Sequence, residues 1–164
     1  MVIISPGNAF QRLGIHLAGL LSLDLSFSSV HPENVVELIL YLTNLQTLVL
    51  ANCQSTNDNN TLIKLLPALT NLRELSIESH WNLNDHLLEQ ITETCPYLET
   101  LNISGCSSFT QRGLSVLSSL KQLQQVLAKN LQVPEKAFGC VTKERDVVLL
   151  VGPASSPKFN RVLP

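Results

Sequence analysis

Residues 98–103 read Leu-Glu-Thr-Leu-Asn-Ile, with leucine-like side chains at the first, fourth and sixth places. The same phrase returns in four further copies, which start at Leu20, Leu45, Leu72 and Leu123. Successive starts lie 25, 27, 26 and 25 residues apart. A fixed period of this length is typical of a solenoid, in which each unit buries its apolar face only against its neighbours. The period therefore predicts an α/β solenoid of about five repeats.

The copy that starts at Leu98 predicts the structure of one repeat. Leu101 and Ile103 are two residues apart, so they point the same way from a strand, and the residues between and beside them face the opposite side. Residues 104–106 turn the chain, Thr110 can cap a helix, and leucines then recur at helical spacing. The next strand should pair parallel to the first. Because a helix is wider than a strand, we expect a curved stack with the parallel sheet on the concave face and the helices on the convex face.

The helix boundaries of the other repeats follow from local signals. Asn84 or Asp85 can start the helix of the third repeat, and Pro96 should end it, because proline disfavours helix in the residue before it. In the second repeat we expect residues 55–61 to form a polar loop and Pro67 to cut the helix short.

The repeat pattern also divides the chain. Residues 1–19, with an apolar helical pattern, are predicted to form an N-terminal half-repeat or cap, and residues 20–131 the repeats. Residues 132–152 are a candidate C-terminal cap and include one further strand near their end, since an uncovered last repeat would expose a row of leucines. Residues 153–164 are polar and contain proline, which predicts a disordered tail.

Composition excludes several functional classes. The chain has 164 residues, 15% of them charged, and a formal net charge of -2, so it lacks the basic field that binds nucleic acid or anionic membranes. Residues 1–4 are too short for a secretory signal, and the apolar run 17–25 is too short to cross a bilayer. The four cysteines form no paired clusters, which predicts reduced thiols in a cytoplasmic or nuclear protein.

Two consecutive segments carry a family resemblance. The motif is Leu98-x-x-Leu101-x-Ile103-x-x-Cys106, followed by Phe109-Thr110-x-x-Gly113-Leu114-x-x-Leu117. It resembles the cysteine-containing leucine-rich repeat, and Cys95-Pro96-x-Leu98 resembles the link between successive repeats of that class. Residues 45–53 and 83–85 give weaker copies, and the resemblance covers residues 20–131.

The resemblance implies a protein-protein interaction module that holds a client protein on the concave face. Proteins of this repeat class are most often F-box substrate receptors of cullin-RING (SCF-type) ubiquitin ligases. Residues 1–19 contain no F-box, so the contact with the ligase adaptor is carried over to no residue here, and any contact with ligase components is expected to be indirect. The chain is then a fragment or isoform of such a receptor, or a relative without an F-box. The alternative is a scaffold, assembly or regulatory protein without a ligase link.

The candidate client-binding residues come from the middle repeats, where the polar positions are densest. They are Arg73, Glu74, Ser76, Glu78, Trp81, Glu99, Asn102 and Ser104. Trp81, the only tryptophan, is either an interface anchor or a cover for the irregular loop of the second repeat. Glu74 and Glu78 share one strand face, and they are either an acidic surface that suits a basic segment of the client or ordinary solvated charges.

One group of side chains resembles a metal site. Cys53, His80 and Cys106 occupy the ninth place of adjacent repeats, and cysteine with histidine is the ligand set that zinc prefers. This column should face into the turn, where small polar side chains satisfy loop backbone groups, so we predict a structural role and no metal. The sequence has no Gly-rich phosphate loop, no Gly-x-Ser-x-Gly elbow and no acid-base set. We therefore expect no catalytic residues, no cofactor and no enzymatic activity.

Overall fold

The computed structural model describes residues 7–142 and 146–152 of the chain. The predictions about a secretory signal in residues 1–4 and a tail at 153–164 concern residues outside these ranges. The described residues form one open sheet of six strands, in the order in which they occur along the chain, and every neighbouring pair is parallel. The strands are β1 (Ser22–Asp24), β2 (Thr47–Val49), β3 (Glu74–Ser76), β4 (Thr100–Asn102), β5 (Gln125–Lys129) and β6 (Val148–Gly152).

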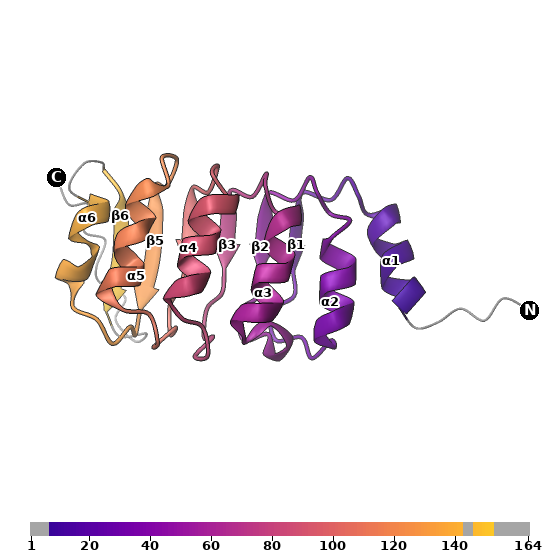
Figure 1. Ribbon diagram of the computed structural model, residues 1–164, viewed down its shortest axis with the longest axis horizontal. Helices are drawn as coiled ribbons and strands as arrows, with labels where there is room; N and C mark the ends of the chain where they lie inside the picture. Colours follow the sequence, from indigo (N-terminus) through magenta and orange to yellow (C-terminus); the bar gives the residue numbers. More distant parts are fainter. Residues whose placement is uncertain (1–6, 143–145, 153–164) are drawn as a thin grey trace, which may run out of the picture.

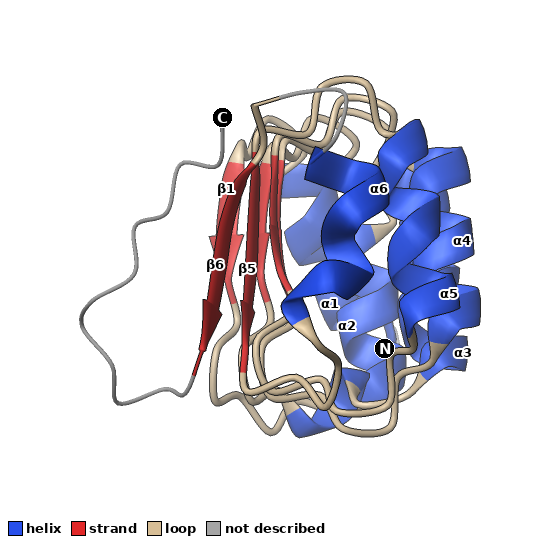
Figure 2. Cartoon of the chain, turned by 90° about the vertical axis from the view of Figure 1, so that its left-hand side faces the viewer, coloured by secondary structure: helices blue, strands red, loops and turns tan. Residues whose placement is uncertain are grey.

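The helices form a second layer on one face of the sheet (Figures 1 and 2). The α-helices are α1 (Gly7–His16), α2 (Pro32–Ile39), α3 (Asn59–Leu65), α4 (Asp85–Thr94), α5 (Gln111–Ser115) and α6 (Gly139–Thr142). Short 3-10 helices are η1 (Gln54–Thr56), η2 (Leu66–Ala68), η3 (Val116–Ser119) and η4 (Glu135–Phe138). Figure 2 shows the strands and helices as two separate layers, and no described helix lies on the other face of the sheet.

The leucine phrase sets the register of the sheet. Its fourth-place residues are aligned in neighbouring strands: Leu23 pairs with Leu48, Leu48 with Leu75, Leu75 with Leu101, and Leu101 with Val126. From Leu48 onward these residues are buried beneath the helices, whereas their strand neighbours alternate to the open face. The predicted strand at the five copies is confirmed, and the further strand near residue 150 is β6.

Most predicted helix boundaries are confirmed. The side chain of Asn84 accepts a hydrogen bond from the backbone N–H of His86 at the start of α4, and α4 ends at Thr94, two residues before Pro96. Thr110 caps α5. Pro67 interrupts the α-helix of the second repeat, which ends at Leu65 and continues as η2. These boundaries depend on local backbone chemistry, which the sequence displays directly.

The predicted polar loop at residues 55–61 is wrong. Ser55 and Thr56 lie in η1, Thr61 lies in α3, and all three side chains are buried. Asp58 caps α3, since its carboxylate accepts a hydrogen bond of 2.9 Å from the N–H of Thr61. The Thr56 hydroxyl is tolerated in the interior because it finds hydrogen-bond partners there, among them the side chain of His80.

The two ends differ in how they pack. α1 lies against α2, where the amide of Gln11 donates to the hydroxyl of Tyr41 over 2.7 Å and Gly14 allows close approach. α1 ends at His16, so the predicted helical pattern extends beyond the helix itself, and Leu13 is 44% exposed. At the other end, η4, α6 and β6 bury Phe138 and Leu149 against the last repeat. No helix within the described ranges is long and apolar enough to span a membrane.

Candidate functional site

The open sheet face is the side of the sheet that carries no helix. It consists of the outward side chains of β1 to β5: Ser22, Asp24, Thr47, Val49, Glu74, Ser76, Thr100, Asn102, Gln125, Leu127 and Lys129. All of them are exposed or partly exposed. The backbone groups of β2 to β5 are engaged in the parallel ladder on both sides, so side chains are the groups that this part of the face offers to a partner. β1 is an edge strand with one partner strand.

Arg73 and Glu99 lie at the edge where the strands begin rather than on the open sheet face itself. Each precedes its strand by one residue and follows a buried leucine, Leu72 or Leu98, so the strict alternation of the strand begins only after it. The Arg73 guanidinium donates to the Glu99 carboxylate, and both side chains remain partly exposed. The structure thus places these two predicted client-binding residues at the edge of the open sheet face, and their role in binding stays a prediction. Together with Gln46 and Tyr97, Arg73 lines a shallow hollow of about 400 Å³ at this edge.

A chain of hydrogen bonds connects the ends of three strands. The Asn102 amide donates to the Glu78 carboxylate over 2.9 Å, and the backbone N–H of Ser104 donates to the Asn102 side chain over 3.0 Å. The backbone N–H of Lys129 then donates to the Ser104 hydroxyl over 3.2 Å. Glu78 is thereby held in place beside Asn102. Ser104 is buried, so its hydroxyl supports the loop and is not presented to a partner.

Acidic groups outnumber basic ones on and around the open sheet face. Within residues 7–142 and 146–152, the carboxylates of Asp24, Glu74 and Glu78 occur with one nearby cation at the strand ends, Lys129, while Arg73 is paired with Glu99. Hydrogen bonds from the side chain and backbone of Ser26 hold the pKa of Asp24 below its ordinary value, so this carboxylate stays ionised. The face is therefore mildly acidic.

The column of Cys53, His80 and Cys106 is buried and fully engaged with the loops. Nδ1 of His80 lies 3.1 Å from the carbonyl of Glu78, and Nε2 lies 2.9 Å from the Thr56 hydroxyl. A carbonyl can only accept, so Nδ1 carries the proton, and in the neutral ring Nε2 is an acceptor. The single proton of the Thr56 hydroxyl then has two acceptors within reach, Nε2 and the Cys53 carbonyl 3.2 Å away. Burial lowers the pKa of His80, which agrees with this neutral form.

The thiols of the column have a similar role. The Cys106 thiol donates to the Ile77 carbonyl over 3.0 Å, and burial raises its pKa to about 12. The Cys53 thiol lies 3.3 Å from the Ser28 hydroxyl. These bonds confirm that the column faces the turns and satisfies groups there. Among the described residues no cluster of three or more His, Cys, Asp and Glu side chains could hold a metal ion.

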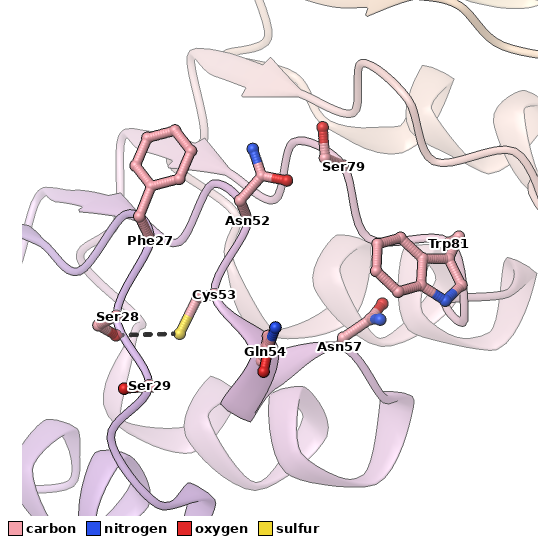
Figure 3. A pocket seen from close by; sticks show the side chains of 9 residues that line it. All are labelled: Phe27, Ser28, Ser29, Asn52, Cys53, Gln54, Asn57, Ser79 and Trp81. Carbon is pink, nitrogen blue, oxygen red and sulfur yellow. Dashed lines mark hydrogen bonds between the residues drawn. The ribbon is translucent and has the colours of Figure 1, made fainter.

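A second hollow lies among the loops that follow β1, β2 and β3. Its volume is about 370 Å³, and Figure 3 shows the side chains around it: Phe27, Ser28, Ser29, Asn52, Cys53, Gln54, Asn57, Ser79 and Trp81. Phe27 and Trp81 stand on opposite sides of this loop hollow and are 77% and 57% exposed. Trp81 is thus placed apart from the other predicted site residues. Its ring lies next to Asn57 of the second repeat, yet more than half of its surface remains free.

Sequence reasoning missed Phe27 and the loop hollow. Phe27 comes three residues after its strand, where the next three loops have Asn52, Ser79 and Gly105. The sequence signal that could have identified Phe27 is an aromatic residue at a turn position where the other repeats have small or polar residues.

The geometry defines an α/β protein with one open, all-parallel sheet covered by helices on one face. No family model matches the sequence, and no curated protein matches it. Solved structures do match, 71 chains in all. One is the crystal structure of a protein from Bacteroides fragilis, which is 21% identical, with a TM-score of 0.53 over 87% of this chain and 43% of that one. The chain spans less than half of that protein, and at this identity the likeness shows the fold alone.

Proposed function

We propose that the chain is a leucine-rich-repeat solenoid whose open, concave sheet face binds a protein client. The open sheet face is the observation that carries this proposal. It presents regular rows of side chains that no described element covers, and the backbone of β2 to β5 beneath them is paired on both sides. A 25 to 27 residue period that places one strand in each unit, in constant register, supports the solenoid. Repeat stacks of this kind create extended binding surfaces.

The charge of the face suggests the chemistry of the client. Glu74 is exposed and Glu78 is held by Asn102, so both can meet a basic segment without first leaving a salt bridge within the described residues. Such charges contribute mainly to association rate and specificity. The resemblance to F-box receptors makes a client of a cullin-RING ligase the first candidate, with indirect contact to ligase components. A scaffold or regulatory role without a ligase remains the alternative.

Charge reversal tests the binding face. We expect the double variant Glu74→Lys/Glu78→Lys to lose its main partner in affinity purification with mass spectrometry from native cells, because a basic segment would meet two lysines. The matched control is Glu33→Lys/Glu93→Lys, which makes the same charge change on exposed residues of the helical layer and should keep the partner. If both double variants recover the main partner equally, the open sheet face is not its binding surface.

The same purification separates the two functional alternatives. Ligase subunits or ubiquitylated proteins that disappear with the sheet-face variant support the receptor role. Partners that disappear in the same way without any ligase component support the scaffold role.

A further inference from the structure

The loops at the carboxyl ends of the strands share one backbone feature. Each has a residue with positive φ at the same place, with values of 59°, 53°, 64°, 74° and 57° for Phe27, Asn52, Ser79, Gly105 and Asn130. Each of these residues also donates its backbone N–H to the next loop, as Phe27 does to the carbonyl of Ala51 over 2.9 Å and Asn52 to that of Glu78 over 3.0 Å. The turn geometry is thus common to all of these loops, while the residue that adopts it varies.

Phe27 is the one bulky, apolar member of this set, which otherwise consists of glycine, asparagine and serine. Glycine and asparagine adopt positive φ readily, whereas for a bulky side chain this conformation is a genuine outlier. The phenyl ring is 77% exposed, so it gains little from packing within the chain. A strained backbone at an exposed aromatic residue is typical of a site where the side chain meets something else.

The loop hollow beside Phe27 has a neutral lining. None of its nine residues is charged, in contrast to the acidic open sheet face. Several side chains there, among them Asn52, Gln54 and Ser29, have no hydrogen-bond partner within the described residues, so their amide and hydroxyl groups are available. Two exposed aromatic rings flank these groups (Figure 3). Rigid aromatic rings combined with Ser and Asn side chains form surfaces that recognise polypeptide, since they supply apolar contact and adaptable hydrogen bonds.

We propose that the loop hollow binds an uncharged segment of a partner protein, which inserts one large apolar side chain between Phe27 and Trp81. The amides of Asn52 and Gln54 then bond the backbone on either side of that side chain. The uncharged lining favours an uncharged segment, because a charged side chain inserted there would lose its hydration without meeting an opposite charge. A volume of about 370 Å³ accommodates one large side chain with adjoining backbone. The inference rests on the proposed function only in taking the occupant to be a protein, and its site is distinct from the acidic face.

The test uses a phage-displayed library of random linear peptides selected on the full chain. Enriched peptides are synthesised, and their dissociation constants are measured by fluorescence polarisation. We expect an aromatic or large aliphatic residue flanked by uncharged residues, with a loss of about tenfold or more in Phe27→Asn and in Trp81→Ala. The matched control is Tyr97→Ala, which removes a 53% exposed aromatic ring at the opposite edge and should leave binding unchanged.

Folding of the variants is checked independently. Asparagine occupies the same turn position at residues 52 and 130, so Phe27→Asn should melt at the same temperature as the natural chain or higher. Loss of peptide binding in a variant that melts no lower than the natural chain then reports on the site itself.

The outcomes separate this inference from the proposed function. Peptides that need Phe27 and Trp81 and tolerate Glu74→Lys/Glu78→Lys support a distinct loop site, even if that double variant leaves the cellular partner unaffected. The inference is overturned if no enriched peptide depends on Phe27, or if the dependent peptides require a charged anchor. Binding of the neutral oligosaccharides cellohexaose or chitohexaose that depends on both aromatic residues, without any such peptide, would overturn the assignment to a protein segment.

Discussion

At the scale of single residues, the turns show how one backbone geometry accepts different side chains. A left-handed conformation costs most residues about 1–2 kcal/mol and costs glycine almost nothing. Gly105 uses this freedom where space is also short, since a Cβ there would lie 3.3 Å from the Cα of Ser79. Asn52 and Asn130 use the tolerance of asparagine for the same region. Phe27 has neither the missing Cβ of glycine nor the tolerance of asparagine for positive φ. The turn geometry therefore does not account for a phenylalanine at this position.

His80 should make stability depend on pH. Burial lowers its pKa in the folded chain below the ordinary 6.5, so between those two values the unfolded chain binds more protons. The contribution of neutral His80 is therefore fully present above about pH 6.5 and is lost as the pH falls toward the folded pKa. We expect the melting temperature to decrease from about pH 7.5 to about pH 5.5. In His80→Gln this decrease should be smaller.

Thermal unfolding at a series of pH values, followed by circular dichroism, measures this effect. His31→Gln is the matched control, because His31 is exposed and its side chain makes no capping bond to α2. Parallel pH profiles for the natural chain and His80→Gln would show that His80 does not control acid stability.

Individual burial states were the least predictable property of this chain. Ser104 and Thr56 are polar turn residues in the sequence, and both are buried because a partner from another segment satisfies their hydroxyl groups. Thr56 and His80 are 24 residues apart, so their contact has no local signature. The role of the ninth-place column was predictable because the repeat itself aligns its members.

At the scale of elements, α4 and α5 are joined through Asp85. Its carboxylate accepts hydrogen bonds from the backbone N–H of Thr110 over 2.8 Å and from the Thr110 hydroxyl over 2.5 Å. The first residue of α4 thereby holds the N-cap of α5. The approach is so close that a Cβ on Gly113 would lie 2.0 Å from Oδ1 of Asp85. Glycine is required at this point by space, since its φ is not in the positive range.

Gly113→Ala should therefore destabilise the fold, although alanine favours helix. We expect a loss of about 1–3 kcal/mol in the free energy of unfolding, measured by urea titration, because Asp85 must move and release Thr110. Gly139→Ala is the matched control, since a Cβ on that helical glycine meets nothing within 4 Å. In the background of Asp85→Gly the clash is absent, because Oδ1, Cγ and Cβ of residue 85 are all removed, so the cost of Gly113→Ala should largely vanish. An unchanged cost in that background would mean that another contact is responsible.

The ends of helices were predictable from sequence because caps and prolines act on the nearest turns. Asn84, Thr110 and Pro96 are examples. The 55–61 segment was missed because its polar composition is typical of a loop, while its structure depends on a buried hydrogen bond to the next repeat. Local chemistry thus sets where helices begin and end. The structure of the 55–61 segment depends instead on contacts between repeats.

At the scale of the whole molecule, one period in the sequence accounts for the parallel sheet and the layer of helices. Strand register follows from it, because the same place in each phrase must be buried. The candidate site was less predictable. The phrase predicts rows of outward residues within the strands. Arg73 and Glu99 lie before their strands, at the edge of the face, and Trp81 lines the loop hollow. Surfaces that combine three loops depend on how far each loop reaches, which the period does not encode.

Labelling of the cysteine thiols tests whether this molecule unfolds as one unit. Cys53, Cys95 and Cys106 are buried in successive repeats, and Cys140 is exposed. Burial raises the pKa of Cys95 to about 11 and that of Cys106 to about 12, so at mildly alkaline pH neither offers much thiolate. In native buffer we expect Ellman's reagent to modify Cys140 alone of the four, with all four reacting in denaturant.

The rates at which the buried thiols react report on cooperativity between repeats. The buried core forms one continuous cluster from Val35 to Leu149, so the successive strand-helix units pack on one another. We therefore expect Cys53, Cys95 and Cys106 to become modified together as urea is raised, at one rate set by global unfolding, when the labelled peptides are resolved by mass spectrometry. Gly113→Ala should accelerate all three in parallel. Faster labelling of Cys53 than of Cys95 and Cys106 would instead show that the repeats nearest the N-terminus open separately, where α1 and β1 leave Leu13 and Leu21 about half exposed.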